Sequence, residues 1–164
     1  VVGYGSIGRR AAHLADAFGM NVVVSTRTAP KNCPYDVTDI LTAAKKADFL
    51  TFHCPLTPQT KGLVNRDILS VMKPSAVLIN TSRGPVVNEA DLAQALNSEK
   101  IAAAYLDVLE KEPMSPDTPL KTAKNCTITP HTAWAAYETR SRLVDIVCAN
   151  IRAWLGGNPQ NKVN

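Results

Sequence analysis

The sequence lacks the features that would direct the protein to a membrane, to nucleic acid or to a zinc site. It has no apolar run near the roughly 20 residues that span a bilayer, and its amino end lacks the charged and apolar segments of a signal peptide. Its 18 basic and 14 acidic residues leave a net charge of +4 and form no basic patch. Four cysteines occur without a CxxC pair, which argues against a metal site and for reduced thiols, at Cys33, Cys54, Cys126 and Cys148. We therefore expect a cytoplasmic protein that uses no metal and binds neither membranes nor nucleic acid.

The length of the chain and its first residues limit the domain organisation that it can have. A chain of 164 residues suits one domain with a substantial core. It begins at Val1 without a methionine and reaches its first glycine after two apolar residues, so we expect a fragment whose first strand is cut. The predicted division is a dinucleotide-binding domain over residues 1–135, followed by a long helix and tail over residues 136–164.

Short apolar runs alternate along the chain with segments of helical period. The predicted strands lie at residues 22–24, 49–52, 76–79, 101–106 and 127–129, after a stub at 1–2. The predicted helices lie at residues 7–18, at 40–47 with Asp36 as its cap, at 65–72 and at 88–96, and the last ends at Gly156 with an apolar face at Leu143, Val147, Ile151, Trp154 and Leu155. Buried strands alternating with helices predict the α/β class, with a doubly wound parallel sheet covered on both faces.

The chain opens on the glycine fingerprint Gly3-Tyr4-Gly5-Ser6-Ile7-Gly8, between the apolar stub and a helix. In such a loop the first glycine permits a tight turn, the second lets the backbone approach a pyrophosphate, and the third allows close packing of helix on strand. The pyrophosphate would then sit on free N–H groups at the start of the helix. This context predicts a Rossmann-type NAD(P)-binding domain.

The end of the second strand is where these domains select between the two nicotinamide cofactors. An acid there binds the ribose hydroxyls and repels a 2′-phosphate, but this chain reads Ser25-Thr26-Arg27-Thr28. Hydroxyls and a guanidinium can bind a phosphate, so Thr26 and Arg27 predict a slight preference for NADPH over NADH. The alternative is that Arg27 stacks on the adenine and NADH still binds.

Three residues suited to hydride-transfer chemistry follow apolar runs and should meet at one edge of the sheet. Arg83 could hold a substrate carboxylate, and His131 could pass a proton to a carbonyl oxygen. Glu112 could bind the second ring nitrogen of the histidine and favour its protonated form. Taken singly, each also fits a plain structural or surface role, but three such residues at one edge are less easily explained that way.

Several further motifs extend along nearly the whole chain. They are His53-Cys54-Pro55-Leu56-Thr57-Pro58, Met72-Lys73-Pro74, Ile79-Asn80-Thr81-Ser82-Arg83-Gly84, Leu106-Asp107-Val108, Glu112-Pro113 and Thr129-Pro130-His131. With the glycine fingerprint, they make the chain resemble the cofactor-binding half of the D-isomer specific 2-hydroxyacid dehydrogenases, in particular their glycerate dehydrogenase and hydroxypyruvate or glyoxylate reductase branch.

The resemblance implies an NAD(P)-dependent oxidoreductase acting on hydroxypyruvate, glyoxylate or D-glycerate, and a homodimer in the parent protein. It implies that Arg83 holds the 2-oxo acid, that His131 is the acid/base and that Glu112 supports it. The implied cofactor-binding residues are Gly3, Gly5, Ser6, Ile7, Gly8, Thr26, Arg27, Pro55, Thr60, Thr81, Asp107 and Ala133. Among these, Ser6 and Ile7 would offer backbone N–H groups to the pyrophosphate, and Asp107 would face the nicotinamide amide.

Members of this family carry a substrate domain ahead of the point where this chain begins. We therefore expect the chain alone to convert substrate weakly or not at all.

Two alternative functions remain open. One is a nucleotide-sensing binding protein similar to the family's corepressors, and the other is a phosphite dehydrogenase on the same scaffold. A formate oxidiser fits less well, because resemblance to the formate branch would call for a glutamine at the position of Glu112.

Overall fold

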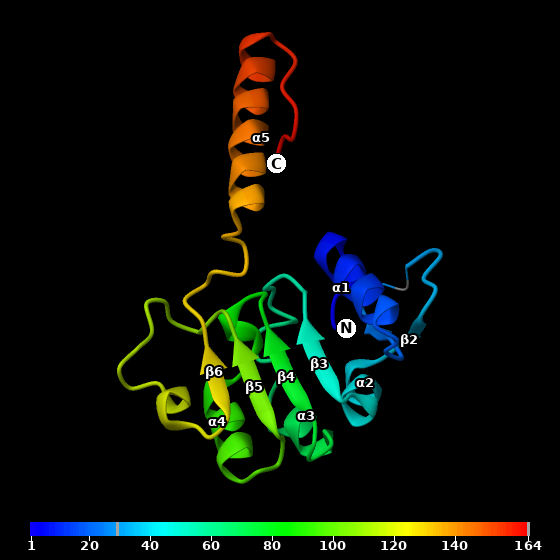
Figure 1. Cartoon of the computed structure of the whole chain (residues 1–164), viewed down its shortest axis with the longest axis vertical. Coiled ribbons are helices and arrows are strands. Elements are labelled where there is room, and N and C mark those ends of the chain that lie inside the picture. The colour runs from blue at the N-terminus through cyan, green and yellow to red at the C-terminus, as the bar shows by residue number, and fades with distance from the viewer. Residues whose placement is uncertain (29, 164) are drawn as a thin grey trace. The chain divides into compact units, whose positions relative to one another are not determined.

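The strands of the protein, seen in a computed structural model that describes residues 1–28 and 30–163, are all parallel (Figure 1). They are β1 (Val23–Ser25), β2 (Asp36–Thr38), β3 (Phe49–Phe52), β4 (Val77–Asn80), β5 (Ala103–Leu106) and β6 (Cys126–Ile128). β1 pairs with β2, and the other four pair in the order β3-β4-β5-β6. The predicted parallel α/β architecture is confirmed.

Val2 connects the two groups of strands. It forms parallel bridges to Ser25 on one side and to Phe52 on the other. Its N–H donates to the Thr51 carbonyl at 2.8 Å, and its carbonyl accepts from His53 N–H at 2.7 Å. The predicted stub therefore occupies the place of a central strand between β1 and β3, where the direction of winding reverses in a doubly wound sheet.

Among the residues that the structure describes, three of the five α-helices begin at a polar side-chain cap. The helices are α1 (Ser6–Ala17), α2 (Ile40–Lys46), α3 (Arg66–Val71), α4 (Glu89–Asn97) and α5 (Tyr137–Leu155), with 3₁₀ turns η1 (Gly84–Val86) and η2 (Pro119–Thr122). Asn65 and Asn88 cap α3 and α4, where the sequence placed the starts of these helices. The predicted cap at Asp36 is wrong, because Asp36 pairs with Val23 in β2 and Asp39 caps α2 instead. The strand β2 has three residues, too few to show a period of two.

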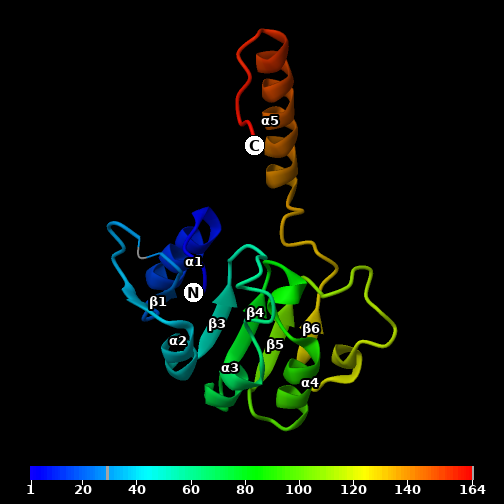
Figure 2. The same ribbon diagram turned by 180° about the vertical axis from the view of Figure 1, so that it is seen from behind.

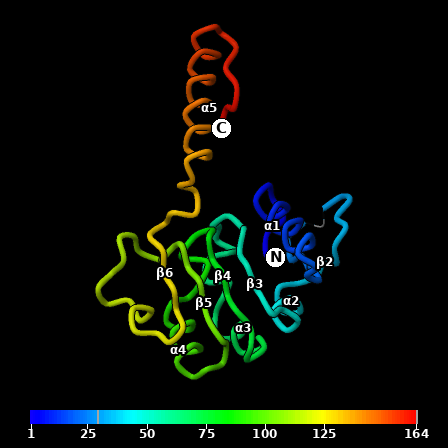
Figure 3. Tube along the Cα trace, viewed as in Figure 1, coloured from blue at the N-terminus to red at the C-terminus, as the bar shows by residue number. Residues whose placement is uncertain are grey.

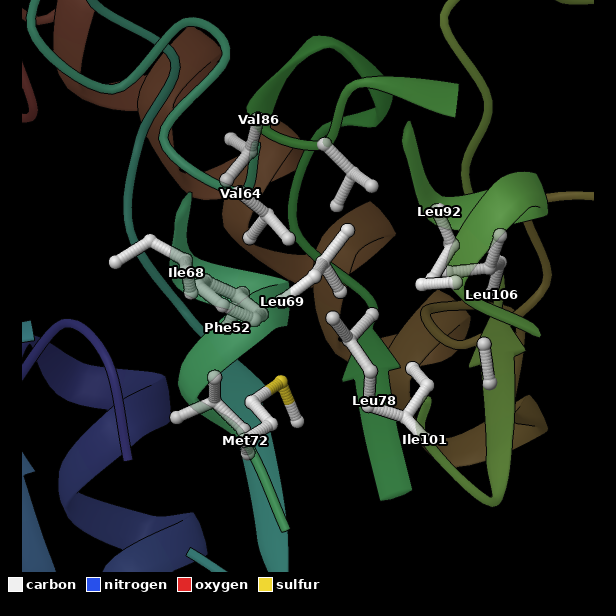
Figure 4. Close-up of a cluster of buried hydrophobic side chains, with 14 of the residues drawn as sticks. Phe52, Val64, Ile68, Leu69, Met72, Leu78, Val86, Leu92, Ile101 and Leu106 are labelled. Carbon is white, nitrogen blue, oxygen red and sulfur yellow. The ribbon is translucent and has the colours of Figure 1, made fainter. Parts of the chain in front are cut away.

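The core lies on the face of the sheet that α3 and α4 cover, as Figures 1 and 2 show from opposite sides. Figure 4 shows Phe52 and Leu78 of the strands packed against Leu69 and Met72 of the α3 region. Side chains alternate along each strand, so residues on the other face are less covered within this unit: Phe49 is 54% exposed and Tyr105 is 50% exposed.

The chain divides into two compact units, Val1–Pro130 and His131–Asn164. In the first, Figure 3 traces the long connection between β5 and β6, which includes η2. In the second, α5 ends at Gly156 as predicted, and its predicted apolar residues are all exposed. In α1, which belongs to the first unit, Gly8 and Ala12 are the buried residues, whereas Ile7, Leu14 and the C-cap residue Phe18 are exposed. No helix within residues 1–28 and 30–163 is long and apolar enough to cross a membrane.

Candidate cofactor and substrate site

The three fingerprint glycines have three different environments. Gly3 has φ of +89°, and a Cβ there would lie 2.6 Å from the His53 carbonyl oxygen. A Cβ on Gly8 would lie 2.0 Å from the Gly3 carbonyl oxygen, so α1 packs directly on the turn. A Cβ on Gly5 would meet no described atom within 4 Å. The loop therefore closes tightly on the protein side at Gly3 and Gly8 and stays open at Gly5, which is the shape that a pyrophosphate needs.

The amino end of α1 lies next to this open side. Gly5 is its N-cap, and the described part of its first turn has neither an acidic residue nor a side-chain cap. Ser6 and Ile7 are exposed, and the first N–H groups of a helix have no acceptor within the helix. The helix dipole adds partial positive charge at the same point. These groups suit a bound phosphate.

A cleft of about 400 Å³ continues from the start of α1 to the carboxyl ends of β3 and β4. Its lining residues are Ile7, His53, Cys54, Pro55, Leu56, Thr81, Ser82 and Arg83. Of the predicted site residues, the structure thus brings Ile7, Pro55, Thr81 and Arg83 together. The cleft lies at the point of the sheet where open α/β proteins bind their ligands.

Asn80 organises the loop that carries Arg83. Its side chain is fully buried, and its Nδ2 donates to the Arg83 carbonyl oxygen at 2.9 Å. Its Oδ1 accepts from the Ser82 N–H at 3.0 Å and from the Ser82 hydroxyl at 2.8 Å. The Arg83 side chain is exposed, and its Nη1 donates to the Ser82 carbonyl oxygen at 2.6 Å. The guanidinium is therefore held at the mouth of the cleft with N–H groups to spare for a carboxylate.

Glu112 lies on the loop that follows β5. Its Oε1 accepts from the Leu109 N–H at 3.0 Å. The same stretch contacts the arginine loop, because a Cβ on Gly84 would lie 1.8 Å from the Leu109 carbonyl oxygen. Only a glycine permits this approach, and the backbones that carry Arg83 and Glu112 therefore pack directly against each other.

Two more predicted residues hold the loops at the strand ends. Asp107 is buried, and its Oδ1 accepts from the Thr129 hydroxyl at 2.6 Å, which ties the end of β5 to the end of β6. The Thr60 hydroxyl donates to the Pro55 carbonyl oxygen at 2.7 Å and accepts from the Thr57 N–H at 2.7 Å. Thr60 thus fixes the turn that places Pro55 at the cleft.

His53 also lines the cleft, as a supporting residue. Its Nε2 lies 3.1 Å from the Thr51 hydroxyl oxygen. Burial lowers the pKa of His53. The contact with the hydroxyl joins the His53 ring to Thr51 of β3 at the edge of the cleft.

The predicted cofactor-selecting residues lie at the end of β1. Ser25 is buried, Thr26 is half-buried and Arg27 is exposed. Because it is exposed, the Arg27 side chain is available to a ligand at this end of the strand. A second arginine, Arg9 of α1, has its guanidinium 5.3 Å from the centre of the Tyr4 ring.

His131 and Ala133 belong to the second unit. His131 has φ of +53°, and its carbonyl oxygen accepts from the Trp134 Nε1 at 2.8 Å. This turn precedes α5 and fixes the backbone around the histidine. No group of three metal-ligating side chains occurs among the residues that the structure describes.

Sequence reasoning missed the polar side chains that position the loops, chiefly Asn80 and Glu89. Asn80 directly follows an apolar strand, and a buried asparagine at a strand end could have been read as a loop clamp. Glu89 sits at the first position of α4, where an acid is expected simply for the helix dipole, so its contacts with a distant loop gave no separate signal.

Comparison with known proteins connects this geometry to one family. The D-isomer specific 2-hydroxyacid dehydrogenase, NAD binding domain, matches residues 1–133. A hydroxypyruvate reductase of Blautia hydrogenotrophica is 44% identical over 169 residues, covering 100% of this chain and 52% of the relative. A human glyoxylate reductase/hydroxypyruvate reductase is 40% identical over 166 residues, covering 97% of this chain and 50% of the relative.

Solved structures give the same picture. The crystal structure of an NADPH-dependent glyoxylate/hydroxypyruvate reductase from Sinorhizobium meliloti, in complex with NADP and malonate, superposes with a TM-score of 0.86 at 37% identity. That match covers 94% of this chain and 50% of the other. The chain therefore spans about half the length of the curated relatives and solved structures that it matches.

Proposed function

Because this chain belongs to the D-isomer specific 2-hydroxyacid dehydrogenase family, we propose that it is the cofactor-binding half of a reductase for a small 2-oxo acid. The substrates are hydroxypyruvate or glyoxylate, with D-glycerate oxidation as the reverse type of reaction. The observation that carries the proposal is the cleft that runs from the start of α1 to Arg83. It offers phosphate-binding N–H groups at one end and a guanidinium for a carboxylate at the other.

The residues of the chain have distinct roles in this reaction. A bound nicotinamide cofactor supplies the hydride for the keto carbon. Arg83 holds the substrate carboxylate and stabilises negative charge that develops on the carbonyl oxygen. His131 donates a proton to that oxygen, and Glu112 orients the histidine and favours its protonated form. Asp107 would face the nicotinamide amide of a bound cofactor, and Pro55, Thr81 and Ala133 would line its site.

The preference for NADPH is a finer part of the proposal and rests on Thr26 and Arg27. The exposed Arg27 guanidinium can bind a 2′-phosphate, and no carboxylate stands at residues 25–28 to repel one. We expect NADPH to bind this chain more tightly than NADH.

The first experiment is a parallel titration of the chain with NADH and NADPH at fixed salt, following nicotinamide fluorescence. Arg27→Ala should weaken NADPH binding by about tenfold, the loss of one charge-assisted contact, and leave NADH binding nearly unchanged. Arg10→Ala, which removes another exposed arginine from α1, is the matched control. Tighter binding of NADH than NADPH to the wild-type chain would overturn the cofactor preference.

Activity is tested in the complete protein that contains this chain. Arg83→Ala should raise KM for glyoxylate and hydroxypyruvate, and His131→Ala should lower kcat by a factor of about 10² to 10⁴. The curated relatives favour this reaction over the corepressor-like and phosphite-oxidising alternatives. Absence of turnover with every 2-oxo acid, together with retained nucleotide binding, would favour the nucleotide-sensing alternative.

Three further proposals concern the parent protein. We propose that residues 136–164 lead back to a substrate domain outside this chain, without which the chain reduces 2-oxo acids weakly or not at all.

We also propose that the complete protein is a homodimer. The exposed apolar residues of α5 support this proposal, and sedimentation of the complete protein would test it. A cytoplasmic location is supported by four cysteines that are all free thiols.

A further inference from the structure

Glu89 is bonded to two points of a loop far from it in sequence. It is the first residue of α4, directly after the Asn88 cap. Its Oε1 accepts from the Glu110 N–H at 2.7 Å, and its Oε2 accepts from the Thr118 hydroxyl at 2.5 Å. The partners lie 21 and 29 residues away. Both carboxylate oxygens are therefore engaged outside the helix.

The loop that Glu89 binds is the one that carries Glu112. One bond lies two residues before Glu112 and the other six residues after it. The Glu112 carboxylate itself accepts from the Leu109 N–H, immediately before the Glu110 anchor. The position of the Glu112 carboxylate thus depends on the backbone at residues 109–110, which Glu89 holds through the Glu110 N–H and Gly84 contacts at the Leu109 carbonyl.

We propose that Glu89 is a positioning residue for Glu112, holding the loop between β5 and η2 so that the Glu112 carboxylate can serve the acid/base histidine. This inference rests on the proposed function. Hydrogen bonds to an ionised carboxylate are about twice as strong as neutral ones, so a single side chain can restrain both ends of the loop. Glu89 does not contact the substrate in this role and acts only through Glu112.

Two substitutions of Glu89 separate the effect of its hydrogen bonds from the effect of its charge. Glu89→Ala removes both bonds and frees the loop. Glu89→Gln keeps an acceptor for the Glu110 N–H and turns its amide toward the Thr118 hydroxyl, which can also accept a hydrogen bond. The glutamine variant should therefore restore most of the loop geometry although the charge is gone.

Asp91 provides the matched control on the same helix. Its Oδ2 accepts from the backbone N–H of Arg66 at 3.0 Å, so Asp91→Ala also removes a carboxylate that joins α4 to another segment. That segment carries no residue of the proposed site. Loss of stability in α4 alone would affect both alanine variants.

The experiment is the pH profile of kcat/KM for glyoxylate reduction in the complete protein, measured with saturating cofactor. Glu112→Gln should move the alkaline limb to lower pH, because the protonated acid is no longer supported. Glu89→Ala should move the same limb in the same direction and lower kcat/KM by about tenfold, whereas Glu89→Gln and Asp91→Ala should leave the limb in place.

The outcomes separate the two proposals. An unchanged limb in Glu112→Gln would overturn the role of Glu112 in the proposed function, and the positioning role with it. A shift in Glu112→Gln without one in Glu89→Ala would overturn the positioning role alone. If Glu89→Ala does not fold, Thr118→Val removes one of the two bonds, and it should give a smaller shift in the same direction. No shift there would also overturn the positioning role.

Discussion

The buried side chain of Asn80 and the backbone of Arg83 are joined by a hydrogen bond of 2.9 Å from the Asn80 Nδ2 to the Arg83 carbonyl oxygen. Together with the two bonds that Oδ1 accepts from Ser82, it uses both ends of the amide. The amide thus turns the chain sharply at the end of β4. It places the guanidinium at the cleft without contacting it.

Asn80→Asp should destabilise the protein although it is nearly isosteric. The ionised form would place a carboxylate oxygen against the Arg83 carbonyl oxygen, in place of an N–H donor, in a fully buried position. Asn80→Ala leaves the groups of Ser82 and Arg83 without these partners, at a cost of about 1–3 kcal/mol in the free energy of unfolding. Urea unfolding would measure both variants.

The control for Asn80 is Asn21→Ala, which changes an exposed asparagine and should leave the free energy of unfolding nearly unchanged. In the complete protein, the Asn80 variants should also raise KM for the 2-oxo acid, because Arg83 loses its fixed backbone. Unchanged KM and stability in Asn80→Asp would contradict this account of the loop.

The glycine loop predicts opposite outcomes for two substitutions of the same kind. Gly8→Ala places a methyl group 2.0 Å from the Gly3 carbonyl oxygen, so α1 must shift away from the turn and stability should fall. Gly5→Ala adds its methyl group where no described atom lies within 4 Å, so the fold should persist. The added methyl group instead occupies the open side of the loop and should weaken nucleotide binding.

Thermal unfolding and NADPH titration on both variants would separate the two effects. Gly8→Ala should show a lower Tm, and Gly5→Ala should show a Tm near that of the wild type with NADPH binding weakened by tenfold or more, about 1.4 kcal/mol. If Gly5→Ala bound NADPH as well as the wild type does, the phosphate site would have to lie elsewhere.

The sequence predicted the order of strands and helices well because the apolar runs are distinct and the caps are asparagines with nearby partners. Asn65 and Asn88 both begin helices as expected. The strand at Asp36–Thr38 was missed because only Thr38 of its residues is even half-buried. An exposed three-residue edge strand leaves no hydrophobic pattern, and its aspartate was therefore read as a cap.

The site was predictable where chemistry requires a particular residue type and was not where geometry alone matters. The arginine after β4 and the open glycine loop follow from strand ends and spacing, and the structure places Arg83 and Ile7 on one cleft. The clamps at Asn80 and Glu89 depend on contacts between segments that are distant in sequence or on burial. No local pattern specifies such contacts.

The thiols of Cys54 and Cys126 should resist alkylation in the folded protein. Burial raises the pKa of Cys54, and burial with a smaller contribution from the Glu89 charge raises the pKa of Cys126 to about 11. Since the thiolate is the reacting form, both should react slowly at pH 8. Iodoacetamide labelling followed by peptide mass spectrometry would give the rate at each cysteine.

The reference for each thiol is its own rate in urea-unfolded protein, which removes differences in local sequence. The ratio of unfolded to folded rate should be largest for Cys54 and Cys126, whose pKa values are raised, and smaller for the exposed Cys148. Equal ratios at Cys126 and Cys148 would contradict the raised pKa of the β6 thiol.

His53 should make stability depend on pH just below neutrality. Because burial lowers its pKa from the ordinary value of 6.5, the unfolded chain binds a proton at this residue at a pH where the folded protein does not. The contribution of His53 to stability is therefore fully present above about pH 6.5 and falls as the pH drops from there toward the lowered pKa of the folded state.

The variant His53→Gln can keep a hydrogen bond to Thr51 and should remove this part of the dependence of stability on pH. Urea midpoints between about pH 7.5 and 5 would show it, with His13→Gln, an exposed histidine of α1, as the control that keeps the wild-type slope. Identical slopes in His53→Gln and the wild type would mean that the ring at the cleft is as accessible to protons in the folded protein as in the unfolded chain.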